Sequence, residues 1–204
     1  MVVKGRVSML KELINQFQYM MEAFQREAPR TQKQRSFSER TTYLSSTFEA
    51  KNGKTIKLEI ANRSHIADVL TIEKLSYDGK TPWGYGALEK DIVRSNQSLY
   101  LVVYHNLKPI AFLGSRLQPQ DIHITNIAVI PTWQNQGIGR LLLELLEAVA
   151  KAEKVDAISL EVRVSNEKAK QLYTNIGFKS LRVKKNYYHG DGEDAVDMRF
   201  YLRD

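Results

Sequence analysis

The sequence predicts an α/β (α+β) fold, with a central sheet that is mixed but mostly antiparallel and helices on both of its faces. Three apolar segments, at about residues 98–104, 109–116 and 122–129, are separated by short turns and predict an antiparallel meander. A leucine-rich stripe at helical spacing follows over residues 138–149, and residues 157–164 have the character of another strand. A strand, a helix and a strand in this order predict a right-handed crossover between parallel neighbours.

The first 46 residues predict a helical extension ahead of the main domain. Residues 9–24 carry apolar side chains at near-helical spacing and predict an amphipathic helix, whereas residues 25–46 are polar and basic and predict a linker or a weakly ordered arm. The helix is expected to dock on the domain or on a second subunit, or to anchor the chain on a partner. The main domain is then expected to span residues 47–204.

The main domain is predicted to begin with a hairpin and two helices. Residues 47–50 and 55–61 flank an Asn-Gly pair that suits a tight turn. Residues 65–77 and about 87–94 predict helices, and the loop between them contains Trp83, which we expect to form a wall of a substrate pocket.

Composition excludes several classes of protein. The 204 residues are 43% hydrophobic, which suits one sizeable domain, and the absence of cysteine excludes disulfides, a cysteine nucleophile and a thiolate metal site. The four histidines show no ligand spacing, so no metal is predicted. Without a long apolar run or a secretory signal, we expect a cytoplasmic protein with no membrane contact. The net charge of +7 suits an acidic partner but is weak evidence for nucleic acid, and direct nucleic-acid binding is not expected.

A glycine-containing segment joins the third strand of the meander to the leucine-rich helix. It reads Gln134-Asn135-Gln136-Gly137-Ile138-Gly139-Arg140. Two glycines let the backbone approach a bulky anion, and the unpaired N–H groups at the start of a helix supply donors and a positive dipole end. The segment lacks the third glycine of a dinucleotide-binding fold and the Gly-Lys-Ser/Thr of a P-loop. The segment therefore predicts a site that binds the pyrophosphate of a phosphorylated cofactor and that differs from both of these motifs.

Motifs downstream of this segment resemble those of the GCN5-related N-acetyltransferase (GNAT) superfamily. The Gln-x-x-Gly-x-Gly pattern is followed by Leu-Glu-Val-Arg-x-Ser-Asn at residues 160–166 and by the segment 169–178. Asn-Tyr-Tyr at residues 186–188 and Gly-Glu-Asp-Ala at residues 192–195 are similar to the bacterial branch that acetylates the N-terminal alanine of ribosomal proteins. The resemblance covers about residues 55–202 and stops before the N-terminal extension.

The resemblance implies a sheet that splays between its fourth and fifth core strands and holds acetyl-CoA in the gap. It implies main-chain contacts to pantetheine from Ile127, Ala128 and Val129, and pyrophosphate contacts from residues 135–140. Gln134 is expected to shape the turn, and Asn166 to cap a helix and to bond CoA. Taken one at a time, Val129 also fits ordinary core and Arg140 a solvated helix charge.

The resemblance also implies the residues that transfer protons. Glu161 is the expected base, because partial burial on an apolar strand would raise its pKa toward the working pH. The alternative is a carboxylate at a strand edge, paired with Arg163 or a lysine. Tyr173 is the expected acid and lies beside the cofactor, although a tyrosine between Leu172 and Ile176 also suits the core. Both substrates are expected to bind together, so that the amine attacks directly.

The expected acceptor is a protein N-terminus. An α-amine with a pKa near 8 is about a tenth neutral at pH 7, far more than a lysine, and suits a single carboxylate base. Trp83, Tyr187 and Tyr188 are expected to line the peptide slot, with acidic residues of the loop 190–194 near the amine. By resemblance, the acceptor is the N-terminal alanine of a small-subunit ribosomal protein. A small-amine acetyltransferase and a non-catalytic acetyl-CoA-binding module remain as alternatives, and the oligomeric state is left open.

Overall fold

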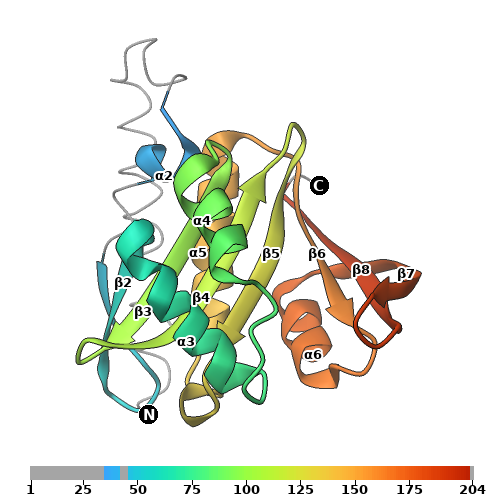
Figure 1. Ribbon diagram of the computed structural model, residues 1–204. Coiled ribbons are helices and arrows are strands. Elements are labelled where there is room, and N and C mark those ends of the chain that lie inside the picture. The colour runs from blue at the N-terminus through green and yellow to red at the C-terminus, as the bar shows by residue number, and fades with distance from the viewer. Residues whose placement is uncertain (1–34, 42–45, 203–204) are drawn as a thin grey trace, which may run out of the picture.

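The computed structural model describes residues 35–41 and 46–202. In this part of the chain, eight strands form one sheet in the order β1-β2-β3-β4-β5-β6-β8-β7 (Figure 1). The strands are β1 (Ser46–Glu49), β2 (Thr55–Ile60), β3 (Ser98–His105), β4 (Lys108–Leu117), β5 (Asp121–Val129), β6 (Ala157–Arg163), β7 (Lys179–Tyr188) and β8 (Glu193–Tyr201). The helices are α2 (Phe37–Arg40), α3 (Ile66–Ser76), α4 (Tyr85–Arg94), α5 (Ile138–Glu153) and α6 (Glu167–Ile176), with 3-10 turns η3 (Arg63–His65) and η4 (Pro131–Trp133).

The predicted meander and hairpin are present. Strands β3, β4 and β5 pair antiparallel in sequence order, and β1 pairs with β2 across the Asn-Gly turn. The central strands β3 and β4 are buried on both faces over most of their length, so their apolar runs lack the alternation of a half-exposed strand. The sheet is mixed, as predicted, because β5 and β6 are parallel.

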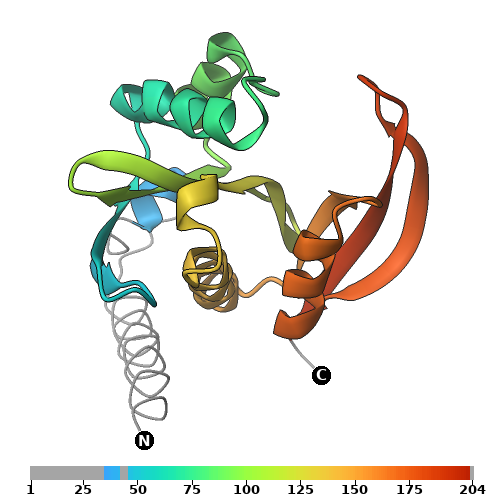
Figure 2. The ribbon, with the colours of Figure 1, turned by 90° about the horizontal axis from the view of Figure 1, so that it is seen from below.

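Helices cover both faces of the sheet, as Figure 2 shows with α3 and α4 on one side and α5 on the other. The apolar stripe of α5 includes Leu142 and Leu146, which are fully buried in the larger core cluster. On the opposite face, Ile66 and Ile72 of α3 pack with Phe112 of β4 in a second cluster. The sheet is therefore buried between two apolar layers at its centre.

The crossover β5–α5–β6 creates the opening that the resemblance implied. Strands β5 and β6 pair in parallel only where residues 121–124 lie opposite residues 157–160. Beyond Ile124 and Leu160 the two strands diverge (Figure 1). The predicted splay between these strands is confirmed, and it leaves one edge of β5 without a neighbouring strand.

The structure revises the expectation for residues 25–46 where it describes them. Ser36 caps α2 in a capping box with Glu39, and the Phe37 side chain is fully buried in the larger core cluster. Arg40 forms a 2.9 Å ion pair with Glu153 of α5. One turn of the expected linker is therefore part of the domain core, because a single aromatic ring supplies enough apolar area to fix it. The predicted helix at residues 9–24 lies outside the described residues.

None of the helices in the described ranges is long and apolar enough to cross a membrane.

Candidate active site

The loop before α5 has the backbone geometry of an anion site. Asn135 and Gly137 have positive φ values of 61° and 85°, and α5 begins at Ile138. The first amides of a helix have no acceptor within the helix. The helical hydrogen bonds of α5 begin with the Leu141 N–H, which donates to the Gly137 carbonyl at 2.9 Å. A Cβ on Gly139 would lie 3.3 Å from Leu172 of α6, so this glycine permits close packing of the two helices.

Side chains around this loop fix its shape and add a charge that the sequence analysis missed. The Gln134 side-chain amide donates to the Val129 carbonyl at 3.1 Å, so Gln134 shapes the turn as predicted. Arg140 forms a 2.7 Å ion pair with Glu144, which agrees with the solvated-charge alternative for this residue. The Lys51 chain lies against Gly137, with Cε 3.5 Å from the position of an added Cβ. Lys51 was missed because its hairpin turn is remote in sequence from the loop.

The free edge of β5 presents alternate residues to the opening. The Ile130 N–H donates to the Ile110 carbonyl of β4 at 2.9 Å. Because hydrogen-bonded pairs alternate along an antiparallel strand, the main chain of Ala128 also faces β4. The main-chain groups of Ile127 and Val129 face the other way, toward β6. Of the three residues expected to contact pantetheine, these two have backbone groups on the open side.

A pocket of about 250 Å³ lies where β5 and β6 diverge. It brings together six of the residues singled out from the sequence, among them both residues expected to transfer protons, whereas residues 134–140 do not line it. Those that line it are Trp83, Ile127, Glu161, Asn166, Tyr173 and Tyr188. Tyr187 is not among its lining residues and packs edge-on against Tyr188, with ring centroids 5.2 Å apart.

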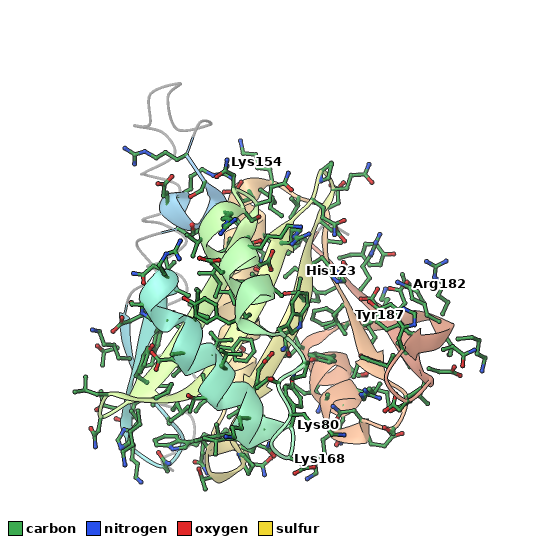
Figure 3. All side chains as sticks on the ribbon, viewed as in Figure 1. Lys80, His123, Lys154, Lys168, Arg182 and Tyr187 are labelled. Carbon is green, nitrogen blue, oxygen red and sulfur yellow. The ribbon has the colours of Figure 1, made fainter. Side chains whose placement is uncertain are left out.

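Glu161 is held by two basic side chains. Its Oε2 lies 3.3 Å from His123 Nε2, and its Oε1 accepts a hydrogen bond from Lys184 Nζ. His123 on β5 and Tyr187 on β7 are marked in Figure 3, on the two sides of β6. Burial is the largest single influence and raises the Glu161 pKa, but the bonds and charges of His123 and Lys184 together hold this pKa at about 2.

The expectation that burial would bring the Glu161 pKa toward the working pH was therefore wrong. The alternative of a carboxylate paired with a lysine is what the structure has, with Lys184 as the partner. Both basic partners come from other strands, one from β5 and one from β7, so the local sequence around Glu161 gave no sign of them. Glu161 is ionised at any working pH.

Tyr173 is a buried phenol that keeps its proton. Its side chain lines the pocket, packs at 5.6 Å against the Phe178 ring, and has a pKa raised above the usual range, first by burial and then by Tyr77 and Tyr188. A phenol that stays protonated is a proton donor rather than a base. Asn166 caps α6 as predicted, with its side-chain oxygen accepting from the Ala169 N–H at 3.1 Å.

The acidic loop before β8 is already neutralised. Asp191 and Glu193 form ion pairs with Arg163 at 2.8 and 2.6 Å, and Asp194 pairs with Lys185. That these carboxylates lie near a substrate amine stays a prediction, and each of them already has a basic partner. Instead, Arg163 stacks over the Tyr188 ring at 4.0 Å, so the loop holds an aromatic wall of the pocket in place.

A buried carboxylate behind the pocket was not found from the sequence. Glu73 of α3 is fully buried, accepts from the Asn126 side-chain amide at 3.0 Å and faces the Trp83 N–H at 3.4 Å. Tyr77 donates to the same Asn126 at 2.8 Å. Burial raises the Glu73 pKa to about 7. The sequence did carry a sign that Glu73 is buried, because Glu73 follows Val69 by one helical turn on the apolar face of α3.

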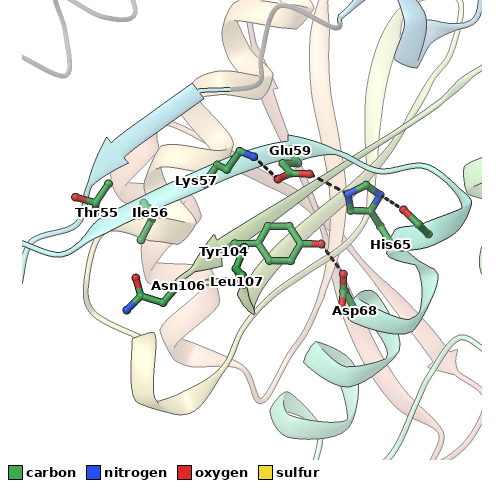
Figure 4. Close-up of a pocket in the computed structure, with 10 residues that line it drawn as sticks. Thr55, Ile56, Lys57, Glu59, His65, Asp68, Tyr104, Asn106 and Leu107 are labelled. Atoms are coloured by element: carbon green, nitrogen blue, oxygen red, sulfur yellow. Dashed lines mark hydrogen bonds and ion pairs between the residues drawn. The ribbon is translucent and has the colours of Figure 1, made fainter.

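A larger hollow of about 430 Å³ lies elsewhere, beside β2, η3 and α3 (Figure 4). Its polar side chains bond one another: Glu59 contacts Lys57 and His65, and Tyr104 donates to Asp68 at 2.6 Å. It lies away from the diverging strands and contains none of the residues expected to act on a cofactor. Within the described ranges, no group of three or more metal-ligating side chains is placed to hold a metal ion.

Comparisons with known proteins agree with this geometry. Residues 66–178 match the model of the acetyltransferase (GNAT) family. The [ribosomal protein bS18]-alanine N-acetyltransferase of Haemophilus influenzae is 37% identical over 124 residues, 59% of this chain and 83% of that protein. An N-alpha-acetyltransferase of Sulfurisphaera tokodaii is 28% identical over 163 residues, 74% of this chain and 95% of that protein.

A solved structure gives the same picture. The crystal structure of the ribosomal-protein-S18-alanine N-acetyltransferase from Escherichia coli has a TM-score of 0.65 and 29% identity, covering 73% of this chain and 95% of that one. The fold is thus shared with an N-acetyltransferase of known structure. The chain belongs to the acetyltransferase (GNAT) family and is an N-acetyltransferase.

Proposed function

We propose that this enzyme acetylates the N-terminal α-amine of a protein, with the N-terminal alanine of a small-subunit ribosomal protein as its acceptor. One observation carries the chemistry: Glu161 and Tyr173, from β6 and α6, line one pocket at the point where β5 and β6 diverge. The names of the bacterial relatives support the choice of acceptor. A ribosomal acceptor also fits a cytoplasmic enzyme.

The open edge of β5 and the loop before α5 fit acetyl-CoA. Main-chain groups of Ile127 and the N–H of Val129 face the opening and suit the amides of pantetheine, whereas the Val129 carbonyl already accepts from Gln134. The amides of residues 137–140 suit the pyrophosphate, with Asn135, Gln136 and Arg140 beside them. Bound there, acetyl-CoA supplies the acetyl thioester. Asn166 lies in the same pocket and contributes a side-chain amide.

Proton transfer falls to the two residues that share the pocket. The ionised Glu161 attracts the acceptor amine and takes a proton from it, directly or through a water. Tyr173, which burial keeps protonated at working pH, is the group in the pocket that can give a proton to the departing sulfur. No covalent enzyme intermediate is required, because the amine can attack the thioester directly when both substrates are bound together.

The aromatic walls suit a peptide end. Trp83 and Tyr188 line the pocket, and Tyr188 is held by Arg163 on one side and Tyr187 on the other. Aromatic faces contact an extended backbone over a large area with little loss of side-chain freedom. A small polyamine or antibiotic would use less of this surface.

The test measures the release of CoA with a panel of acceptors. Short peptides that begin with alanine, serine or methionine are compared with the same peptides blocked at the N-terminus and with spermidine. We expect turnover of the free alanine peptide and none of its blocked form. Turnover of spermidine alone would favour the small-amine alternative.

A variant separates catalysis from binding. Glu161→Gln is expected to lower kcat by about a hundredfold or more while acetyl-CoA affinity stays unchanged. Unchanged turnover in this variant would contradict the role of Glu161, and the absence of turnover with every acceptor would favour a non-catalytic acetyl-CoA-binding module.

A further inference from the structure

Two side-chain hydrogen bonds hold one aromatic wall of the pocket from behind. The Tyr77 hydroxyl donates to Asn126 Oδ1 at 2.8 Å, and Asn126 Nδ2 donates to Glu73 Oε1 at 3.0 Å. Tyr77 and Asn126 line the pocket that Glu161 and Tyr173 share, whereas Glu73 does not line it and is fully buried. The bonds therefore connect the pocket wall to a buried carboxyl group of α3.

The carboxylate of Glu73 fixes the direction of these bonds. An ionised carboxylate offers acceptors and no donor, so the Asn126 amide turns its NH₂ group toward Glu73 and its oxygen toward Tyr77. Burial raises the pKa of Tyr77 to about 12, so the phenol keeps its proton and donates it in a hydrogen bond to that oxygen. Each of the three side chains thus has a partner of the matching kind.

Tyr77 is therefore a wall that resists displacement. Turning its ring out of the pocket would leave the partly buried Asn126 oxygen without its donor, and an unpaired polar group in such a place is costly. The backbone is fixed as well, because the Tyr77 N–H donates to the Glu73 carbonyl at 2.8 Å where α3 ends. The ring packs against the core cluster that contains Phe112. Residues 78–82, which follow directly, are all exposed and have no such support from the core.

Aromatic rings leave little room in the pocket. Its volume is about 250 Å³, and its lining residues include Tyr77, Trp83, Tyr173 and Tyr188. Tyr77 and Tyr188 lie close enough to Tyr173 to add to the effect of burial, which raises its pKa. This space has to hold the thioester end of acetyl-CoA together with the first residue of the acceptor. A small first side chain fits it better than a long or branched one.

We propose that Tyr77 is a specificity-determining residue that limits the first side chain of the acceptor to a small one, and that Glu73 is a positioning residue that holds Tyr77 in place through Asn126. The inference rests on the proposed function, because it requires an acceptor with a free N-terminal α-amine. Glu161 and Tyr173 act on any amine that reaches the thioester, whereas Tyr77 selects among the peptide ends that carry one. A wall fixed by hydrogen bonds selects more sharply than one that moves aside.

The first test compares kcat/KM for two peptides that differ only in their first residue, alanine or leucine, at pH 8, where Glu73 is mostly ionised. The wild type is expected to prefer alanine. In Tyr77→Ala the ratio of the two values is expected to fall by about tenfold or more, because the wall is removed. Tyr85→Ala is the matched control, since Tyr85 is 51% exposed on α4 and does not line the pocket, and it is expected to keep the wild-type ratio. An unchanged ratio in Tyr77→Ala would overturn the proposal.

Two variants of Glu73 separate positioning from packing. Glu73→Leu fills the buried volume but accepts no hydrogen bond, so the ratio of alanine to leucine turnover is expected to fall by about three- to tenfold. Glu73→Gln keeps an oxygen for Asn126 Nδ2 and is expected to keep most of the wild-type ratio. The dissociation constant of acetyl-CoA, measured by calorimetric titration, is expected to stay unchanged in both variants. Equal ratios in Glu73→Leu and Glu73→Gln would overturn the positioning role.

Tyr77→Phe keeps the ring and removes only the hydroxyl that bonds Asn126. Its ratio of alanine to leucine turnover is expected to fall by about threefold. Were Tyr77→Ala not to fold, an unchanged ratio in Tyr77→Phe would overturn the proposal. A wild-type enzyme that acetylates spermidine and no peptide would refute the proposed function, and the role of Tyr77 with it. Peptide turnover with the same ratio in every variant would refute the role of Tyr77 alone.

Discussion

The amide N–H of Lys51 donates to the carbonyl of Gln136 at 3.1 Å, which joins the β1–β2 turn to the loop before α5. This contact places a lysine beside the proposed pyrophosphate site, although the two segments are far apart in the sequence. The hairpin therefore both supports the loop and adds positive charge to it.

Lys51→Glu is expected to raise the KM for acetyl-CoA by about three- to tenfold at low salt, because it puts a negative charge near the pyrophosphate. The effect should shrink at 1 M salt, where screening is strong. Lys179→Glu, an exposed change on β7, is the matched control. Equal KM values for the two variants would contradict the placement of the pyrophosphate.

Gly137→Ala is expected to weaken acetyl-CoA binding and to destabilise the protein by about 1–2 kcal/mol. Gly137 has a φ of 85°, which a residue with a Cβ adopts at a cost, and the turn directs the loop amides. Gly86→Ala in α4 is the control, since nothing lies within 4 Å of the added Cβ and alanine favours a helix. Calorimetric titration with acetyl-CoA and thermal melting measure both effects. Unchanged affinity in Gly137→Ala would argue against the loop as the anion site.

Glu73 makes stability depend on pH. Burial raises its pKa from 4.5 to about 7, so the folded chain binds this proton more tightly than the unfolded chain does. The contribution of this protonated carboxyl to the free energy of unfolding is therefore full below pH 4.5 and is lost as the pH rises through about 7. The free energy of unfolding of Glu73→Gln, relative to that of the wild type, is expected to rise by about 3 kcal/mol between pH 4 and pH 8. Urea unfolding at a series of pH values measures the difference, and a difference that does not vary with pH would refute a titrating Glu73.

Phe37 is expected to mark the start of the stably folded domain. Because its side chain is fully buried, Phe37→Ala is expected to destabilise the protein by about 3–5 kcal/mol, whereas Leu107→Ala, at a side chain 93% exposed, should change stability by less than about 0.5 kcal/mol. A chain that begins at Thr47 is expected to bind acetyl-CoA when folded but to melt below one that begins at Arg35. Equal melting temperatures would mean that α2 adds nothing to the core.

Local patterns predicted most of the fold. The apolar meander, the stripe of α5 and the Asn166 cap depend on residues close together in sequence, and each is present. Only the family resemblance predicted that Glu161 and Tyr173 share a site. The strands, the helix and the cap were predictable because short-range periodicity and capping encode them directly.

The electrostatics of the site were not predictable in the same way. His123 and Lys184 reach Glu161 from strands β5 and β7, and only the strand order places them there. Phe37 is a lone aromatic residue in a polar segment, so periodicity gave it no weight. Glu73 carried a visible signal, as a carboxylate on an apolar helix face, but its partner Asn126 lies on β5.

The most direct test of the account is a crystal structure of the enzyme with acetyl-CoA and an alanine peptide. We expect the pantetheine chain between β5 and β6, the pyrophosphate on the amides that begin α5, and the peptide amine within reach of Glu161. Coenzyme bound elsewhere, or a pyrophosphate that makes no contact with residues 137–140, would contradict it.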